Sequence, residues 1–336
     1  MTGSTIAILG AGSWGTALAI RLARNGHRCM LWGHDPAHIA RLRADRSNQQ
    51  YLPGIPFPPQ LDVCEDLQAT VAGVGLVVLV LPSHAFRSCL QTVAPWLAPD
   101  VHIAWATKGL ELTTGRLLDD VVSELLDPTT PAAVISGPTF AAEVAADLPT
   151  AVTVASRQPG FAQEVAARLH SEQFRAYTSD DVIGVQVGGA TKNVLAIAAG
   201  VADGIGFGAN ARAALITRGL SEIMRLGLVL GARSETLMGL AGLGDLILTC
   251  TDNQSRNRRF GLGLGRGLRR EDVAAEIGQE IEGVVTTRLV YQRSRELGVD
   301  MPITEQVYRM LYEDLPAVDA VRNLLLRSQK AETMGR

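Results

Sequence analysis

The chain has 336 residues, of which 47% are hydrophobic and 19% charged, and its formal net charge is −3. This length accommodates about two globular domains with ordinary cores. The charge excludes bulk electrostatic attraction to nucleic acid or to an anionic membrane. Four cysteines occur without CxxC or CxxH spacing, so we expect reduced thiols in a cytoplasmic protein and no metal site.

The sequence predicts no membrane insertion. The longest apolar candidate, LVVLVL (76–81), has the length of a strand rather than of a bilayer span. The opening stretch MTGSTIAILGAG has no basic region before its apolar run, so it does not resemble a signal peptide.

The first half of the chain alternates short apolar runs with helical patterns. Continuous apolar strands separated by helices predict a parallel sheet covered on both faces. The proline-rich stretch YLPGIPFPPQ (51–60) predicts a loop. The predicted strands are TIAILG (5–10), RCMLWG (28–33), LVVLVL (76–81), HIAWAT (102–107), AAVISG (132–137) and TAVTVA (150–155).

After about residue 180, helices rich in small residues dominate. We therefore predict an α/β domain over residues 1–181 and an all-helical domain over residues 182–336. FGLGLGRG (260–267) has no preceding strand and predicts a loop. The predicted helices cover residues 182–202, 210–231, 234–250, 271–277, 283–297 and 304–313.

A G-x-G-x-x-G motif, formed by Gly10, Gly12 and Gly15, follows the first strand and opens a helix. In this context the first glycine permits a tight turn, the second admits a pyrophosphate and the third allows close helix packing. The backbone amides of Ser13 and Trp14 would face the anion. The motif predicts a doubly wound, Rossmann-type domain that binds a dinucleotide.

The residues after the second strand bear on the choice between NAD and NADP. An acidic residue at this position would bind the ribose 2′-hydroxyl of NAD. The sequence there is WGHDP, which places His34 before Asp35. A histidine suits a 2′-phosphate whereas an aspartate repels it, so the sequence favours NADP and leaves NAD open.

Lys192 lies in the apolar stretch GVQVGGATKNVLAIAAGVADG (184–204). A helix that is apolar on nearly all sides is normally buried, and a buried ammonium needs a partner or a function. Burial lowers the pKa of a lysine, which would suit it to general acid–base catalysis. The alternative is a lysine that reaches solvent from a surface helix.

Polar residues follow two further strands of the first half. Lys108 comes just past the strand at 102–107, at the edge where such sheets bind ligands, and Gly137 and Thr139 come past the next strand. Lys108 could equally be a solvated loop lysine.

In the second half, Asp245 lies within the apolar segment GLAGLGDLILTC, and Ser255, Arg256 and Asn257 follow it. Arginine with neutral donors is typical of a phosphate-binding site. Asp245 could instead cap a helix. Arg256 also belongs to a run of arginines that could form a solvated basic face or a weak nucleic-acid patch; its other members are Arg258, Arg259, Arg266, Arg269 and Arg270.

Six blocks of sequence resemble the bacterial NAD(P)-dependent glycerol-3-phosphate dehydrogenase family, in order and over nearly the whole chain. The blocks are GAGSWGTALA, LPSHAFR, ATKGLE, SGPTFAAEVA, TKNVLAIAAGVADGIGFGANARAALITRGL and GLAGLGDLILTCT followed by SRN. The resemblance implies reduction of dihydroxyacetone phosphate to sn-glycerol 3-phosphate, for phospholipid synthesis, by a cytoplasmic homodimer.

The resemblance also implies roles for single residues. Lys192 matches the general base of the family. The implied substrate contacts are Lys108, Gly137, Thr139, Lys192, Asp245, Ser255, Arg256 and Asn257. The implied cofactor contacts, beside the glycine loop, are Ser13, Trp14, His34, Lys108, Ala141, Arg256 and Glu282.

Two alternatives remain at this stage. One is another hydroxyacid dehydrogenase with a Rossmann domain and a helical domain, of the 6-phosphogluconate or β-hydroxyacid type. The other is a non-catalytic protein that senses a dinucleotide. A sensor would keep the glycine loop but would not need Lys192, Asp245 and Arg256 together.

Overall fold

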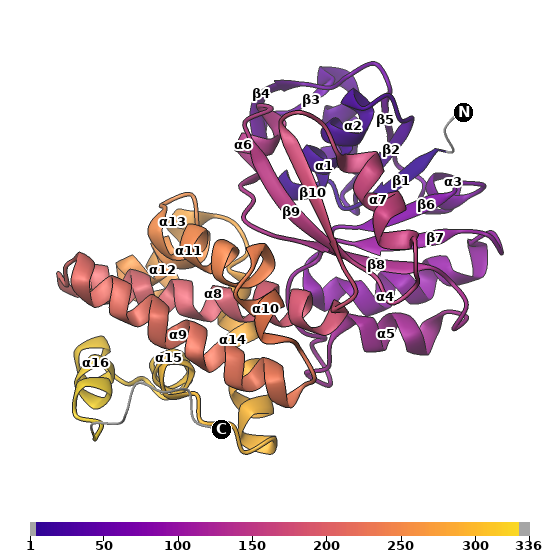
Figure 1. Ribbon diagram of the computed structural model, residues 1–336. Helices are drawn as coiled ribbons and strands as arrows, with labels where there is room; N and C mark the ends of the chain where they lie inside the picture. Colours follow the sequence, from indigo (N-terminus) through magenta and orange to yellow (C-terminus); the bar gives the residue numbers. More distant parts are fainter. Residues whose placement is uncertain (1–4, 329–336) are drawn as a thin grey trace. The chain divides into compact units, whose positions relative to one another are not determined.

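The computed structural model describes residues 5–328 and divides the chain into two compact units. The first comprises the chain up to residue 111 together with residues 116–186. The second comprises residues 187 onward together with the short loop 112–115, which the predicted boundary at 181/182 did not include. Figure 1 shows the first unit in indigo to magenta and most of the second in orange to yellow.

The first unit is built on an eight-stranded sheet with the order β10-β9-β8-β7-β6-β1-β2-β5. All neighbouring strands are parallel except β8 and β9, which are antiparallel, so the predicted all-parallel pairing is wrong at that one ladder. The strands are β1 (Ile6–Leu9), β2 (Cys29–Trp32), β5 (Leu61–Cys64), β6 (Leu76–Leu79), β7 (His102–Trp105), β8 (Ala132–Ser136), β9 (Thr150–Ala155) and β10 (Phe174–Ser179).

The chain leaves β1 towards β2 and β5 and then returns to place β6 on the other side of β1. This reversal is the topological switch point at which doubly wound sheets bind their ligands, beyond the carboxyl ends of the strands. The predicted α/β fold class is thereby confirmed, with the glycine motif directly after β1.

Helices of the first unit form two groups, one containing α1, α6 and α7 and the other α3, α4 and α5, whose members pack against one another. Because the chain reverses direction at the switch point, right-handed crossovers place helices on opposite faces of the sheet. The helices are α1 (Ser13–Arg24), α2 (Pro36–Asp45), α3 (Leu67–Val71), α4 (Ser83–Val93), η1 (Ala94–Trp96), α5 (Leu118–Leu125), α6 (Ala141–Ala145) and α7 (Phe161–Leu169).

The predicted loop at residues 51–60 is wrong in part. Residues Leu52–Pro56 form β4, which pairs antiparallel with β3 (Ser47–Asn48) in a separate two-stranded sheet. The prolines misled the prediction because proline is tolerated in an edge strand, where its missing N–H is not needed for a ladder. Strands β5 and β10 were also not predicted.

The second unit is helical, as predicted. The segment predicted as one helix over residues 234–250 is broken into two α-helices and a π-helical turn, and two helices, α12 and α16, were missed. The elements are α8 (Val182–Ile205, which begins in the first unit), α9 (Ala209–Val229), α10 (Ser234–Leu237), the π-turn η2 (Leu240–Gly244), α11 (Asp245–Thr251), α12 (Arg256–Gly265), α13 (Arg270–Ile277), α14 (Glu282–Glu296), α15 (Pro302–Tyr312) and α16 (Ala317–Leu325).

Glycines pack α8 directly against α12. A Cβ atom on Gly204 would lie 2.4 Å from the Leu262 carbonyl oxygen, and one on Gly261 would lie 2.0 Å from that of Ile197. Small residues spaced by four along both helices let the two backbones touch. This explains why most of FGLGLGRG, predicted as a loop, is helical: Gly261, Gly263 and Gly265 serve close packing, whereas Gly267, with a φ of +80°, lies in the turn after the helix.

Helix α8 is long and apolar enough to cross a membrane by length and composition, contrary to the prediction that no segment would be. However, 94% of its most apolar window is buried inside the structure. Such burial is typical of the central helix of a globular domain.

A buried carboxylate caps α15. Glu222 of α9 accepts hydrogen bonds from the backbone N–H groups of Ile303, at 2.5 Å, and Thr304, at 3.1 Å. These are N–H groups of the first helical turn, which have no partner within a helix. Burial raises the pKa of Glu222 to about 7.

Replacing Gly261 by alanine should destabilise the protein by about 3 kcal/mol or more, because the new methyl group collides with backbone that cannot move aside. Chemical denaturation would measure this loss. Gly208→Ala is the matched control, since a Cβ there meets no described atom within 4 Å, and it should cost less than ~1 kcal/mol. Equal stability of the two variants would contradict the packing argument.

Candidate active site

The glycine loop after β1 has room for glycine alone at two of its three motif positions. Gly10 adopts a φ of +126°, and a Cβ on it would lie 2.2 Å from the Val80 carbonyl oxygen. A Cβ on Gly15 would lie 1.9 Å from the Gly10 carbonyl oxygen. In contrast, a Cβ on Gly12 would meet none of the described atoms within 4 Å. Gly12 therefore borders open space that a ligand can approach closely.

Helix α1 begins at this open space without a side-chain cap among the described residues. The amides of its first turn, including those of Ser13 and Trp14, thus remain available to an anion. The indole N–H of Trp14 is buried and has no hydrogen-bond partner within residues 5–328. These features fit the pyrophosphate of a dinucleotide.

Two buried side chains contact the loop, and neither was predicted from the sequence. The carbonyl oxygen of Ala11 accepts a hydrogen bond from Asn48 Nδ2 at 3.0 Å and lies 3.2 Å from His38 Nε2. Asn48 Nδ2 also donates to Thr16 Oγ1 at 2.8 Å. The antiparallel pair β3–β4, which carries Asn48, therefore helps to fix the shape of the glycine loop.

The residues after β2 differ in what their side chains do. Asp35 caps α2, because its carboxylate accepts a hydrogen bond from the Ala37 N–H at 3.0 Å. His34 is exposed. The carboxylate that could have bound a ribose hydroxyl is thus already engaged at a helix terminus.

Lys108, Gly137 and Thr139 meet at the carboxyl ends of β7 and β8. Lys108 Nζ donates to the Gly137 carbonyl at 3.1 Å, and Thr139 Oγ1 donates to the same oxygen at 3.2 Å. Gly137 has a φ of +150°, and a Cβ on it would lie 3.0 Å from Val152 Cα. Lys108 is half-buried and bonded, so the alternative of a solvated loop lysine is wrong. Ala141 begins the helix that follows this loop.

Lys192 is buried in the second unit and forms an ion pair. Only 7% of the residue is exposed, and its Nζ lies 2.7 Å from Asp245 Oδ1, which is itself fully buried. Nζ also donates to Thr249 Oγ1 at 3.0 Å, and Thr249 Oγ1 donates to the Asp245 carbonyl at 2.6 Å. The alternatives of a solvent-seeking lysine and of a helix-capping aspartate are both wrong.

The local structure around this pair explains its geometry. Gly188 lies one turn before Lys192 on the same face of α8, and a Cβ there would lie 2.4 Å from the Ala241 carbonyl oxygen. The π-turn η2, which contains Ala241, directly precedes Asp245. Thr249 follows Asp245 by four residues and so shares its helix face. That spacing could have identified Thr249 from the sequence.

Two opposing effects act on the Lys192 amine. Burial favours the neutral form, whereas the adjacent carboxylate favours the ammonium. A lysine in this balance can both donate and accept a proton. Cys250 lies on α11 together with Asp245. Its thiol is unsuited to proton exchange near neutral pH, because burial raises its pKa to about 12.

Ser255, Arg256 and Asn257 surround the N-terminus of α12. Ser255 Oγ accepts the N–H of Arg258 at 3.2 Å, and Asn257 Oδ1 accepts the N–H of Gly283 at 2.9 Å. Since only the acceptor oxygens are used in these two bonds, the serine O–H and the asparagine amide can still donate to an anion.

Arg256 and the start of α14 complete this region. Arg256 is half-buried and makes a long 3.4 Å contact from Nη1 to Gln279 Oε1. Gly283 follows Glu282, the first residue of α14, and a Cβ on it would lie 3.0 Å from the Asn193 carbonyl oxygen. The start of α14 therefore lies against α8 beside Lys192.

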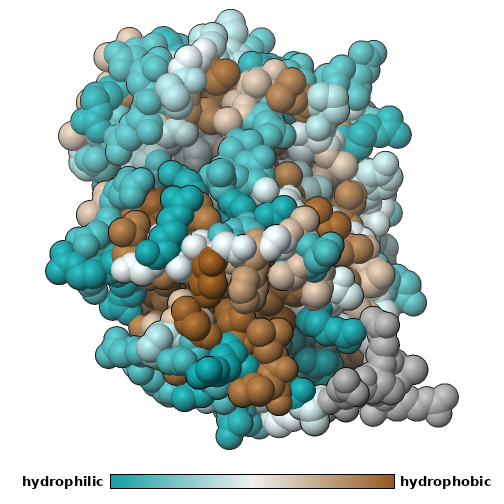
Figure 2. Space-filling view, turned by 90° about the vertical axis from the view of Figure 1, so that its left-hand side faces the viewer, coloured by the Kyte–Doolittle hydropathy of each residue, from teal (hydrophilic) through white to brown (hydrophobic). Residues whose placement is uncertain are grey.

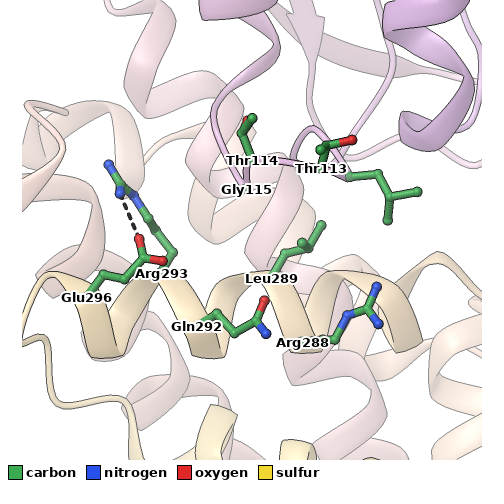
Figure 3. A pocket seen from close by; sticks show the side chains of 9 residues that line it. Thr113, Thr114, Gly115, Arg288, Leu289, Gln292, Arg293 and Glu296 are labelled. Atoms are coloured by element: carbon green, nitrogen blue, oxygen red, sulfur yellow. Dashed lines mark hydrogen bonds and ion pairs between the residues drawn. The ribbon is translucent and has the colours of Figure 1, made fainter.

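A pocket of about 290 Å³ lies elsewhere in the second unit, between the loop 112–115 and the later turns of α14 (Figure 3). Arg293 on its wall is paired with Glu296 at 2.9 Å. None of the predicted site residues is among the described residues that line it. The pocket is therefore distinct from the predicted site.

The first unit has a glycine loop that fits a dinucleotide, and the second has a buried lysine–aspartate pair and polar side chains at the start of α12. Such a combination defines the class of nicotinamide-dependent dehydrogenases.

Comparison with known proteins gives the family. Residues 5–162 match the model of the NAD-dependent glycerol-3-phosphate dehydrogenase N-terminus, and residues 181–322 match that of the C-terminus. The chain belongs to the NAD-dependent glycerol-3-phosphate dehydrogenase family, which confirms the resemblance seen in the sequence.

Individual relatives agree over nearly their full length. Glycerol-3-phosphate dehydrogenase (NAD(P)+) of Methylococcus capsulatus is 59% identical, with 97% of this chain and 98% of the relative covered. The protein of the same name from Shewanella halifaxensis is 57% identical, with 98% and 97% covered. A crystal structure of the Coxiella burnetii glycerol-3-phosphate dehydrogenase has 50% identity and a TM-score of 0.95, with 97% and 100% covered. A ketopantoate reductase from Ralstonia eutropha, at 19% identity and a TM-score of 0.59, shares the fold alone.

Replacing His34 by aspartate should shift cofactor preference towards NADH. A carboxylate there repels a 2′-phosphate and suits a free 2′-hydroxyl, so the NADPH/NADH ratio of kcat/KM should fall about tenfold or more. Steady-state kinetics with both cofactors measure the ratio. Asp35→Asn is the control, because asparagine caps a helix as well as aspartate does. An unchanged ratio in His34→Asp would show that this residue does not meet the 2′-position.

Proposed function

We propose that this protein interconverts dihydroxyacetone phosphate and sn-glycerol 3-phosphate with NAD(P)H. The observation that carries the proposal is the buried Lys192–Asp245 pair, held in the same helical unit as the anion donors at the start of α12. A proton-exchanging group and a phosphate site are what this reaction requires of the protein. Membership of the family supports the same conclusion.

Lys192 has the role of general acid and base. When bound, the nicotinamide supplies a hydride to C2 of the substrate during reduction and accepts one during oxidation. The charge that develops on the C2 oxygen during reduction needs a proton, and the Lys192 ammonium donates it. Asp245 and Thr249 hold the amine in place and stabilise the charged form. In oxidation the neutral amine accepts the same proton.

The start of α12 has the role of phosphate site. Arg256 offers a planar pair of donors, and Ser255 and Asn257 add neutral ones. The N-terminal end of the helix adds its dipole and free amides. Lys192 and Asp245 complete the substrate contacts that we propose in this unit.

The first unit has the role of cofactor site. We assign to it the glycine loop with Ser13 and Trp14, and His34 and Ala141; from the second unit, Arg256 and Glu282 are assigned the same role. Lys108, Gly137 and Thr139 are assigned to the substrate, and Lys108 to the cofactor as well. Engagement of the Asp35 carboxylate in capping α2 supports a preference for NADP over NAD.

We further propose a cytoplasmic homodimer, without membrane insertion, that supplies glycerol 3-phosphate for phospholipid synthesis. Figure 2 shows apolar side chains gathered on one face of the molecule. Among the described residues, exposed large apolar side chains of the second unit include Leu228, Val229, Met238, Ile247, Leu268, Val318, Leu325 and Leu326. Exposed apolar surface of this kind supports association with a second copy.

The experiment that tests the function follows nicotinamide absorbance after dihydroxyacetone phosphate is added with NADPH or with NADH. Dihydroxyacetone phosphate should be reduced with either cofactor, and faster with NADPH. Turnover of 6-phosphogluconate or of a β-hydroxyacid instead would favour the alternative dehydrogenases. Binding of NADPH without turnover of any of these would favour a dinucleotide sensor.

Lys192→Ala should lower kcat by roughly 10²–10⁴-fold, the usual contribution of a positioned acid or base. Lys192→Arg should fail nearly as badly, because a guanidinium does not exchange its proton near neutral pH. Fluorescence titration should show that both variants still bind NADPH, which controls for folding. Near-normal turnover in either variant would refute the assigned role.

Arg256→Ala should lower kcat/KM for dihydroxyacetone phosphate. The loss should correspond to about 2–4 kcal/mol of transition-state stabilisation, since a charge-assisted contact is lost in a partly dry site. The weak activity with unphosphorylated dihydroxyacetone should change much less. Arg259→Ala, which removes an exposed arginine from the same helix, is the matched control. Equal losses on both substrates would mean that Arg256 does not bind the phosphate.

A further inference from the structure

Arg258 differs from the arginines around it because it is buried, with 7% of the residue exposed. Its Nε donates to the Cys250 carbonyl at 3.1 Å. Its two terminal nitrogens donate to Asn253 Oδ1 and to Asp203 Oδ2. The alternative of a solvated basic face is therefore wrong for Arg258. Its guanidinium is bound to the protein's own acceptors and is not directed at a ligand.

The three acceptors come from three different segments. Cys250 lies in the last turn of α11, where backbone carbonyls have no partner within the helix and attract cations. Asn253 lies in the link between α11 and α12, and Asp203 lies in the last turn of α8, the helix that carries Lys192. The Arg258 guanidinium thus connects the link to α8, which carries Lys192, and to α11, which carries Asp245.

This link determines where the phosphate donors lie. It runs over residues 252–255 and ends at Ser255, the N-cap of α12. Hydrogen bonds within the link include that from the Gln254 N–H to Asp252 Oδ1 at 2.7 Å. The backbone N–H of Arg258 also donates to Ser255 Oγ. Arg258 therefore fixes the link from both its side chain and its backbone.

We propose that Arg258 is a positioning residue for the phosphate site: it holds the 252–255 link so that Ser255, Arg256 and Asn257 are prearranged to bind the substrate phosphate. This inference rests on the proposed function of those three residues. Donors that must be rearranged on binding lose affinity, and displacement by about 1 Å can cost roughly 10²-fold.

Loss of Arg258 need not unfold the unit. Asp203 also pairs with Arg212, through Nη1 contacts of 2.9 and 3.1 Å to its two oxygens. Truncating Arg258 therefore does not leave the Asp203 carboxylate as an uncompensated buried charge, the situation that makes removal of one ion-pair partner most destabilising. Lysine in place of arginine cannot satisfy three divergent acceptors, because its ammonium is a single point charge.

The test compares Arg258→Ala, Arg258→Lys and the exposed-site control Arg259→Ala with the wild-type protein. Arg258→Ala should raise KM for dihydroxyacetone phosphate roughly ten- to hundredfold, with a much smaller change in kcat. Arg258→Lys should fall between Arg258→Ala and the wild type, and Arg259→Ala should match the wild type. The weak activity with unphosphorylated dihydroxyacetone should be unchanged in all of them. KM for NADPH should change much less than KM for dihydroxyacetone phosphate, because Arg256 is the one member of the three donors that is also assigned to the cofactor.

A second variant keeps the proposal testable if Arg258→Ala does not fold. Asn253→Ala removes the exposed end of the network and should raise KM for dihydroxyacetone phosphate by several-fold. Unchanged KM in a folded Arg258→Ala or in Asn253→Ala, or equal losses with phosphorylated and unphosphorylated substrate, would overturn the positioning role. A wild-type protein that does not reduce dihydroxyacetone phosphate would overturn the proposed function first, and the positioning role with it.

Discussion

The contact between Lys192 and Asp245 is the constraint on which the helical unit depends. An ammonium in an apolar helix is stable only if a carboxylate reaches it, and Asp245 does so at 2.7 Å. That distance requires α11 to approach α8 closely. Two features permit this approach. Gly188 on α8 has no side chain, and it packs against the backbone of the π-turn that ends just before Asp245. The same segment then continues into the link that ends at Ser255, where the proposed phosphate donors begin, so the packing and the proposed chemistry share one set of contacts.

The close packing extends along α8 beyond the ion pair. Gly200 and Gly204 meet the backbone of α12, and Gly283 brings the start of α14 against Asn193 and Asn257. These contacts bring the N-terminal ends of α12 and α14 close to α8 near Lys192. Larger side chains at the glycine positions would hold the helices apart. Glycine lowers the intrinsic stability of a helix. Its repeated presence in buried helices of this unit is explained by the need for these approaches.

Much of the fold followed from periodicity and motif context. Apolar strands and the glycine loop predicted the sheet and its cofactor site, because such runs and G-x-G-x-x-G require a particular local structure. Three features could not be predicted that way. The antiparallel β8–β9 pairing depends on a chain reversal that leaves the apolar pattern unchanged. The glycine-rich second half of α12 looks like a loop until its partner helix is known. In the sequence, Arg258 cannot be told from the exposed arginines near it. Its partner Asp203 lies on another helix, far away along the chain.

In the proposed reaction the Lys192 ammonium supplies the proton to the C2 oxygen when the C2 carbonyl is reduced. The most direct measurement is the pH dependence of kcat/KM for dihydroxyacetone phosphate reduction in the wild type and in Lys192→Ala. The wild-type rate should fall at high pH as the ammonium loses its proton, and the residual rate of the variant should not show that fall. The same fall in both proteins would contradict the claim, because the titrating group would then be a different one.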